Sequence, residues 1–330
     1  MPDLPTAVVD HANSLADRGQ VRDAFHLLND AIARGDALAA ATLADWRLTG
    51  AVIRRDLGEA RALFGRAAEL GLDEAEAVYL ALLASGAGGI ERHWDEMLEG
   101  LHRRGGQNQL ARRQLSLLNA MKLDKAGNPA RDFPSEQLRS NPDIVRFPRF
   151  LSGDEAAFVI DQANPLLSPS VVIDQTGAII RDPVRTSSAA VFPFTREDPV
   201  LHAINRRIAA VTRTTYEQGE PIQVLSYEPG QQYKLHSDAL PTGHNQRAMT
   251  FLVYLNDDYA GGETQFPDSN LTHRGERGDG LLFHNIDSHG QPYAAARHAG
   301  LPVRQGRKLL LSKWIRVAPL DLSGAPGRPF

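Results

Sequence analysis

The first third of the chain carries apolar residues at the three- and four-residue spacing of helices. One stripe runs through residues 21–32, and another runs through residues 57–68, which lie 36 positions later. The segments that follow the stripes repeat at the same offset, so that Gly50 matches Gly86. A weaker third copy, of the second helix type and shifted by one, lies around residues 94–104. This repetition predicts stacked helix pairs, and a plain helical bundle is the alternative.

Two domains joined by a linker are predicted. Residues 1–123 form the α-helical repeat domain. One glycine and three prolines then interrupt residues 124–142, which we interpret as the linker. Residues 143–330 are rich in short β-type runs separated by turn residues. A chain of 330 residues is long enough for about two domains with cores of their own.

The second domain begins with a strand and a helix and continues mainly as strands. Ser152 and Glu155 have the spacing of a capping box, which predicts a helix at residues 153–163. Strands are predicted at residues 144–150, 188–192, 221–227, 249–255, 280–283 and 308–317. Because no helices alternate with the later strands, the pattern favours a sandwich or barrel over a parallel sheet.

Composition narrows the range of functions. The formal net charge is -4, whereas nucleic-acid binding needs a basic surface, so nucleic acid is not expected as a partner. The chain has no cysteine, which excludes disulfides, thiolate metal sites, iron–sulfur clusters and cysteine nucleophiles. No apolar run has the length of a membrane span, and no signal-peptide pattern is found near the N-terminus. We therefore expect a cytoplasmic protein without a membrane partner.

The candidate chemistry lies near His236 and Asp238. In an extended chain these residues are two positions apart, so both side chains leave the same face. One imidazole and one carboxylate are two of the three ligands of the 2-His-1-carboxylate facial triad, which holds non-haem Fe(II). A hydrogen-bonded surface pair has the same spacing, so the pair alone is weak evidence. A third ligand must come from a distant strand, and the candidates are His284, His289 and His298.

Longer segments around this pair resemble a known family. Residues 144–317 are similar to the prolyl 4-hydroxylase branch of the Fe(II)/2-oxoglutarate dioxygenases, and the helical part resembles tetratricopeptide repeats of the Sel type. The segments that match the dioxygenases are YKLHSD (233–238), RAMTFLVYLNDDYAGGETQFP (247–267), GDGLLF (278–283) and HAGLPVRQGRK (298–308). The resemblance implies a double-stranded β-helix, or jelly roll, as the catalytic domain.

The resemblance also implies roles for particular residues. The iron ligands would be His236, Asp238 and His298. Lys308 would bind the far carboxylate of 2-oxoglutarate, and Tyr227 and Thr250 would help to orient this co-substrate. An inward lysine is costly unless it meets a carboxylate, which 2-oxoglutarate supplies. Arg307 is the rival anchor, but it points to the opposite face of the same predicted strand.

The family chemistry implies Fe(II), 2-oxoglutarate and dioxygen, with L-ascorbate expected as well. The leading hypothesis is a dioxygenase that hydroxylates a prolyl residue or a proline-like ring, in a small molecule or in a peptide that the helical repeats recruit. The alternatives are a hydroxylase of a free amino or imino acid and, from another class, a repeat-based adaptor with a vestigial oxygenase domain. The substrate-contact candidates are Arg185, Tyr233 and Trp314.

Overall fold

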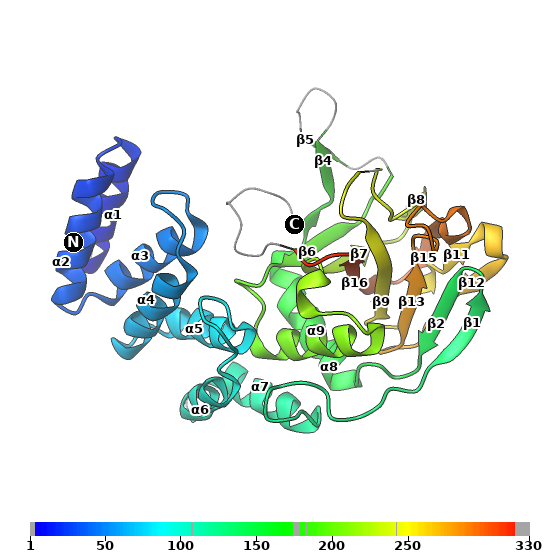
Figure 1. Ribbon diagram of the computed structural model, residues 1–330, viewed down its shortest axis with the longest axis horizontal. Helices are drawn as coiled ribbons and strands as arrows, with labels where there is room; N and C mark the ends of the chain where they lie inside the picture. The colour runs from blue at the N-terminus through cyan, green and yellow to red at the C-terminus, as the bar shows by residue number, and fades with distance from the viewer. Residues whose placement is uncertain (1–3, 107, 174–178, 182–183, 242, 321–330) are drawn as a thin grey trace. The chain divides into compact units, whose positions relative to one another are not determined.

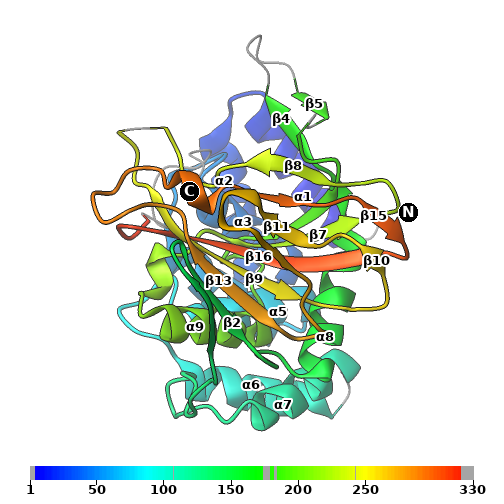
Figure 2. The same cartoon turned by 90° about the vertical axis from the view of Figure 1, so that its right-hand side faces the viewer.

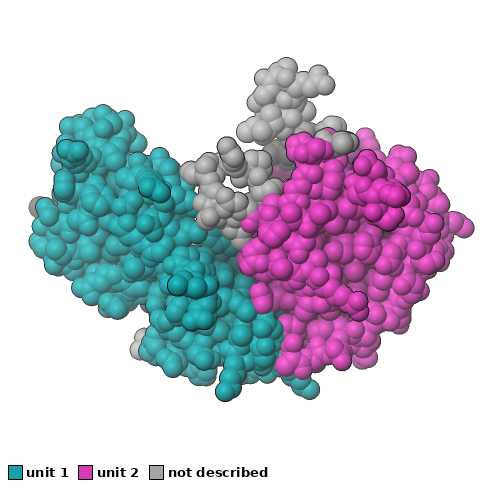
Figure 3. All heavy atoms as spheres, viewed as in Figure 1, with its two compact units in different colours: residues 1–128, 194–204, 321–330 teal, residues 129–193, 205–320 magenta. Residues whose placement is uncertain are grey.

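A computed structural model describes residues 4–106, 108–173, 179–181, 184–241 and 243–320. These residues divide into two compact units (Figure 3). The first unit comprises residues 1–128 together with 194–204, and the second comprises residues 129–193 and 205–320, in each case as far as they are described. The predicted boundaries of the domains and of the linker stay predictions, and residues 321–330 of the predicted second domain lie outside the described residues.

The described N-terminal segment of the first unit is all-helical, as predicted (Figure 1). Its helices are α1 (Leu4–Asp17), α2 (Val21–Ala33), α3 (Ala37–Thr49), α4 (Leu57–Glu69), α5 (Asp73–Ser85), α6 (Trp94–Gly105) and α7 (Gln109–Ala120). Helix α4 begins 36 residues after α2, and α5 begins 36 residues after α3. Helix α6 begins 37 residues after α4, so the shifted third copy repeats the first helix of the pair, and its predicted assignment to the second type is wrong.

Local hydrogen bonds fix where these helices begin and end. The carboxylates of Asp36 and Asp56 accept the backbone N–H groups of residues three positions later and so cap α3 and α4. Gly50 and Gly86 end α3 and α5 in the left-handed conformation, with φ of 69° and 78°, which glycine adopts without a side-chain clash. The glycines that repeat in the sequence are therefore helix stops.

Alanines allow the helices of this unit to pack closely. A buried cluster joins α3, α4 and α5 through Ala40, Ala44, Leu48, Ala60, Phe64, Ala67, Ala75 and Leu82. Phe194, which follows the helices by more than seventy residues in the chain, belongs to the same cluster. The core of this unit therefore includes a segment that the sequence pattern assigned to the β-rich half.

The second unit contains a large and a small antiparallel sheet. The large sheet has eight strands in the order β1 (Glu136–Ser140), β2 (Asp143–Phe147), β13 (Gly280–His284), β9 (Arg247–Tyr254), β16 (Lys308–Arg316), β7 (Ile222–Tyr227), β6 (Ser188–Phe192) and β3 (Ser168–Pro169). Figure 2 shows β16 running beside β9. Strand β1 lies within residues 124–142, the segment interpreted as a linker.

The small sheet has four strands in the order β12 (Leu271–His273), β11 (Thr264–Phe266), β14 (His298–Gly300) and β8 (Tyr233–His236). Two further pairs are β10 (Ala260–Gly261) with β15 (Val303–Gln305), and β4 (Val171–Ile173) with β5 (Ile179–Arg181). Phe266 of the small sheet packs edge-on against Phe283 of the large sheet, with ring centroids 5.1 Å apart. Two antiparallel sheets that share a core form the double-stranded β-helix, as predicted.

The predicted helix at residues 153–163 is confirmed as α8 (Gly153–Ala163), with both hydrogen bonds of the capping box. The Glu155 carboxylate also accepts two hydrogen bonds from Arg207, at 2.7 and 2.8 Å. Arg207 lies in α9 (Pro199–Thr212), a helix that the sequence pattern did not predict. The predicted strands are confirmed to within a few residues at their ends, whereas several strands of two to four residues were missed.

Candidate metal centre

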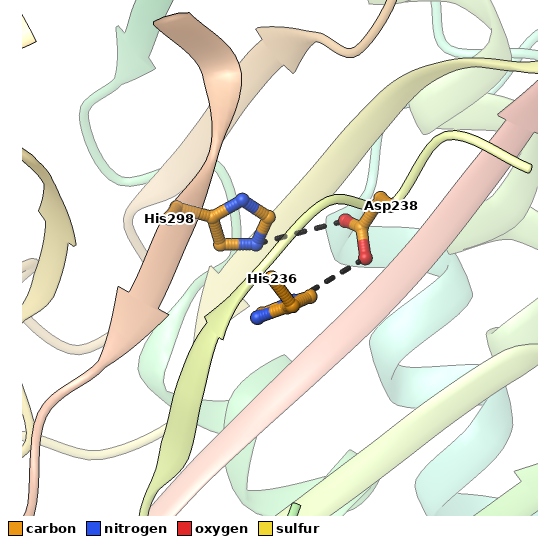
Figure 4. Close-up of side chains that lie close together, drawn as sticks. All are labelled: His236, Asp238 and His298. Atoms are coloured by element: carbon orange, nitrogen blue, oxygen red, sulfur yellow. Dashed lines mark ion pairs between the residues drawn. The ribbon is translucent and has the colours of Figure 1, made fainter. Parts of the chain in front are cut away.

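Three side chains with metal-binding atoms converge in the second unit (Figure 4). Among the described residues, only His236, Asp238 and His298 form such a group, and their ligand atoms lie within 4.8 Å of one another. The Nε2 atom of His236 is 3.4 Å from Asp238 Oδ1, and the Nε2 atom of His298 is 3.7 Å from Asp238 Oδ2. The structure therefore brings together the pair in the sequence motif and one of the three downstream histidines.

A bulge in the small sheet aims these side chains. His298 of β14 lies opposite His236 of β8, and Gly300 lies opposite Tyr233. Two steps along β14 thus match three steps along β8, so β8 carries one extra residue. As a result Tyr233 and His236, which would otherwise leave opposite faces, stack with ring centroids 3.4 Å apart.

Hydrogen bonds determine which nitrogen of the His236 and His298 imidazoles is free to bind a metal ion. The Nδ1 atom of His236 is 2.8 Å from the Lys234 carbonyl, and that of His298 is 3.1 Å from the Ala296 carbonyl. A carbonyl only accepts, so each Nδ1 must carry the proton, and each Nε2 is left with its lone pair toward Asp238.

The charges at the centre also suit a metal cation. Burial lowers the pKa of His298 to about 4, so the ring is neutral at pH 7 and can donate its lone pair. Burial acts to raise the pKa of Asp238, but the His298 and His236 imidazoles and the Thr250 hydroxyl outweigh it and hold this pKa well below its usual range. The carboxylate is therefore ionised.

The donor set fits Fe(II). The Nε2 atom of His236 is buried and makes no hydrogen bond with any described residue, so it lacks a partner that a metal ion would supply. Two imidazoles and one carboxylate are the ligands of the facial triad, which leaves positions open for other molecules. Phe283 packs edge-on against the His298 ring at 4.6 Å and restricts its rotation.

The three side chains line one end of a pocket between the two sheets. The complete lining is Leu225, Tyr227, Tyr233, His236, Asp238, Leu252, Thr264, His298, Gly300, Lys308, Leu310, Ser312 and Trp314. Lys308, Leu310, Ser312 and Trp314 alternate along β16 and share its inner face, as predicted. Thr264 was not singled out from the sequence, because one threonine in a short strand carries no recognisable signal.

Lys308 is a buried cation in this pocket. Its side chain is 2% exposed, and its ammonium donates to the Gly262 carbonyl at 2.7 Å. It forms no ion pair with any described carboxylate, and burial lowers its pKa to about 8. Arg307 points elsewhere, since its guanidinium donates to Ser226 and to Asn164.

The remaining site residues suggested by the sequence lie in three different places relative to the pocket. Tyr227, Tyr233 and Trp314 line the pocket. Thr250 does not line it but lies behind Asp238, to which its hydroxyl donates at 2.6 Å. Arg185 is also outside the lining; it bridges to Tyr233 in the sheet, with its guanidinium 5.6 Å from the ring.

Arg247 was missed by the sequence reasoning. Its guanidinium lies 3.6 Å over the ring of Trp314, and the carboxylate of Glu220 holds it at 2.6 and 2.9 Å. This stack fixes the indole at the wall of the pocket. The only available signal was the position of Arg247 three residues before Thr250, which does not reveal the contact with a strand 67 residues away.

The chain is similar in sequence to a family of oxygenases and to known prolyl 4-hydroxylases. The family model of the 2OG-Fe(II) oxygenase superfamily matches residues 222–316. Prolyl 4-hydroxylase 1 of Arabidopsis thaliana is 37% identical over 201 residues, which are 55% of this chain and 71% of the relative. Prolyl 4-hydroxylase subunit alpha-1 of Rattus norvegicus is 33% identical over 184 residues, which are 53% of this chain and 34% of the relative. The solved viral collagen prolyl hydroxylase of Paramecium Bursaria Chlorella virus-1, in its 2OG complex, is 27% identical with a TM-score of 0.41 and covers 53% of this chain and 96% of its own.

Proposed function

The chain belongs to the 2OG-Fe(II) oxygenase superfamily, and on this premise we propose that it hydroxylates a prolyl residue of a peptide. The observation that carries the proposal is one pocket that holds both the His236, Asp238 and His298 cluster and the buried ammonium of Lys308. The enzyme is a dioxygenase that uses Fe(II), 2-oxoglutarate and dioxygen and releases succinate and carbon dioxide. Ascorbate dependence stays a prediction from the family resemblance.

We propose that His236, Asp238 and His298 hold the iron through their Nε2 atoms and the carboxylate. When bound, Fe(II) with 2-oxoglutarate and dioxygen supplies the oxidising power that inserts one oxygen atom into an unactivated C–H bond. The chain's own contribution is to present two neutral imidazoles and one ionised carboxylate, with their backbone hydrogen bonds already formed.

Lys308 is the proposed partner of the C5 carboxylate of 2-oxoglutarate. A charge-assisted hydrogen bond to a carboxylate offsets the cost of burying this ammonium. The ring of Tyr227 lies 5.6 Å from the ammonium, and the hydroxyl of Thr264 bonds that of Tyr254 at 2.9 Å in the same region. Tyr227 and Thr264 therefore complete the proposed co-substrate end, and Thr250 acts elsewhere.

The substrate end is proposed to lie between Tyr233 and Trp314. Both aromatic rings line the pocket, and each can pack against a pyrrolidine ring. The indole N–H of Trp314 is buried and donates to no described acceptor, so we assign only the indole ring to the substrate contact. Arg185 would support Tyr233 from behind.

The helical repeats are proposed to recruit the peptide. The first unit carries a groove lined by Asp73, Glu76, Arg103, Arg104 and Asn108. A groove with both charges fits a polar peptide. Arg103→Glu should raise KM for long peptides and leave KM for short ones unchanged, whereas Arg22→Glu, on an exposed position of α2, serves as the matched control. Equal KM values for all three proteins would exclude recruitment through this groove.

One experiment separates the candidate functions. The purified protein is incubated with Fe(II), 2-oxoglutarate and either a prolyl peptide or free proline, and succinate and the gain of one oxygen atom are measured. Turnover on the peptide supports the proposal, whereas turnover on free proline alone favours the amino-acid hydroxylase. A protein that takes up neither iron nor 2-oxoglutarate would contradict the proposal and favour the adaptor hypothesis.

No helix within the described part of the chain is long and apolar enough to cross a bilayer. A cytoplasmic location stays a prediction from the sequence, and fractionation of cells followed by immunoblotting would test it.

A further inference from the structure

We propose that Asn285 and Thr250 are positioning residues that hold the carboxylate of Asp238 in one orientation through a directed chain of hydrogen bonds. This inference rests on the proposed function, because it concerns the side chain that would bind the iron. The resemblance had suggested that Thr250 orients 2-oxoglutarate, and Asn285 had no expected role.

The chain of hydrogen bonds is short and fully buried. The Nδ2 atom of Asn285 donates to Thr250 Oγ1 at 2.8 Å, and Thr250 Oγ1 donates to Asp238 Oδ2 at 2.6 Å. Asn285 and Thr250 are each 1% exposed, and Asp238 is 5% exposed. Water therefore does not compete for these groups, and each bond is stronger than it would be at the surface.

Only one direction of donation satisfies the three groups. A carboxylate oxygen accepts, so the single proton of the Thr250 hydroxyl must point to Asp238. The group behind Thr250 must then be a donor, which selects the amide nitrogen of Asn285 over its oxygen. An aspartate in place of Asn285 would instead compete for the threonine proton.

The backbone holds both residues firmly. Thr250 lies in the middle of the large sheet, opposite Phe283 of β13 and Trp314 of β16. Asn285, directly after β13, donates its N–H to the Ala248 carbonyl at 2.8 Å and accepts from Tyr293 N–H at 2.8 Å. Backbone hydrogen bonds therefore hold both residues, Thr250 within the sheet and Asn285 directly beside it.

The amide of Asn285 is held at a cost to stability. Its Oδ1 atom is buried and has no hydrogen-bond partner among the described residues. Such an atom has given up its hydrogen bonds to water without gaining one in the folded protein, which destabilises the fold. An apolar side chain would avoid this cost, so the orientation of the amide is explained by its bond to Thr250 and, through it, to Asp238.

The consequence concerns metal affinity. With Oδ2 engaged by Thr250, the carboxylate cannot rotate freely about its Cβ–Cγ bond, and Oδ1 stays 3.4 Å from His236 Nε2. A ligand set that is already ordered loses less conformational freedom when the metal binds. Loss of an outer hydrogen bond of this kind typically weakens metal binding by about 10–100-fold.

The test measures binding of Co(II) to the metal-free protein by visible absorption, without turnover. Thr250→Val, which keeps the shape but removes the hydroxyl, should weaken Co(II) binding by about 10–100-fold. Thr250→Ser should restore nearly wild-type affinity, and Thr272→Val, at an exposed threonine of β12, should have no effect. Asn285→Ala should weaken binding less than Thr250→Val does.

A double variant tests the chain itself. Because Asn285 acts through Thr250, the Thr250→Val/Asn285→Ala protein should bind Co(II) no more weakly than Thr250→Val alone. The inference would be overturned if the two substitutions lowered the affinity for Co(II) additively, or if Thr250→Ser bound Co(II) as weakly as Thr250→Val. Equal affinity of Thr250→Val and wild type would overturn it as well. A wild-type protein that binds no Co(II) would instead refute the proposed metal centre. If Thr250→Val does not fold, as judged by circular dichroism, the serine and Asn285→Ala variants carry the test.

Discussion

Replacing Lys308 by methionine should stabilise the free protein. Burial lowers the pKa of this lysine from 10.5 to about 8, which at 1.36 kcal/mol per pKa unit corresponds to about 3 kcal/mol of unfavourable free energy in the folded state. Methionine removes this cost but leaves the Gly262 carbonyl without its donor, which costs about 1 kcal/mol. We therefore expect the free energy of unfolding at pH 7 to rise by about 2 kcal/mol.

The pH dependence of this effect has a definite sign. The folded pKa lies below the unfolded one, so between about pH 8 and 10.5 the unfolded chain binds more protons than the folded chain. The lysine's contribution makes the wild type more stable as pH rises through this window. The variant lacks that rise, so its advantage should be largest below pH 8 and absent above pH 10.5. Urea unfolding curves at a series of pH values measure the difference.

Addition of 2-oxoglutarate should narrow this difference in stability, because wild type binds it more tightly than the variant does. The co-substrate gives the ammonium a carboxylate partner worth about 1.5–3 kcal/mol, so its affinity, measured by calorimetry, should fall at least about tenfold in Lys308→Met. Lys125→Met, at an exposed lysine of the first unit, is the control. A variant that is less stable than wild type at pH 7 without co-substrate, yet binds it equally well, would refute the reasoning.

Three further outcomes are expected. Asp238→Ala should abolish both Co(II) binding and succinate release, and retained turnover would contradict the ligand assignment. Glu155→Gln leaves the fully buried Arg207 without its charge partner, so the free energy of unfolding in urea should fall by about 3–5 kcal/mol. The control is Glu136→Gln, at a half-exposed partner of Arg146, which should lower it by less than about 1 kcal/mol. Trp314→Ala should raise KM for a prolyl peptide and leave 2-oxoglutarate affinity unchanged in calorimetry; an unchanged peptide KM would remove Trp314 from the substrate end.

Features that depend on neighbouring residues could be predicted from the sequence. The capping box of α8 involves residues three positions apart, and the inner face of β16 follows from the two-residue period of a strand. His236 and Asp238 were recognised for the same reason. His298 was chosen among three candidates only through the family resemblance, because no local rule connects β8 with β14.

Features that depend on strand pairing could not be predicted. The bulge of β8 arises from its register against β14, so the stacking of Tyr233 on His236 has no signature in the local sequence. The same holds for Asn285, which reaches Thr250 across the β9–β13 ladder. Phe194 is part of the helical core, although the residues just before it form strand β6. Its burial is determined by contacts with α3 to α5, which the hydrophobic pattern of its own segment does not reveal.

Two buried polar groups in the pocket destabilise the free protein, and a vestigial domain would have no reason to retain them. The buried Nε2 atom of His236 lacks a partner, and the buried ammonium of Lys308 forms no ion pair with a described carboxylate, although the Glu263 carboxylate acts to raise its pKa. Each lowers the stability of the free protein, and simple substitutions, such as methionine for Lys308, would relieve them. A metal cation relieves the first and a dicarboxylate the second. The two groups lie in one pocket, as the joint binding of iron and 2-oxoglutarate requires, so their common position favours an active enzyme over an adaptor.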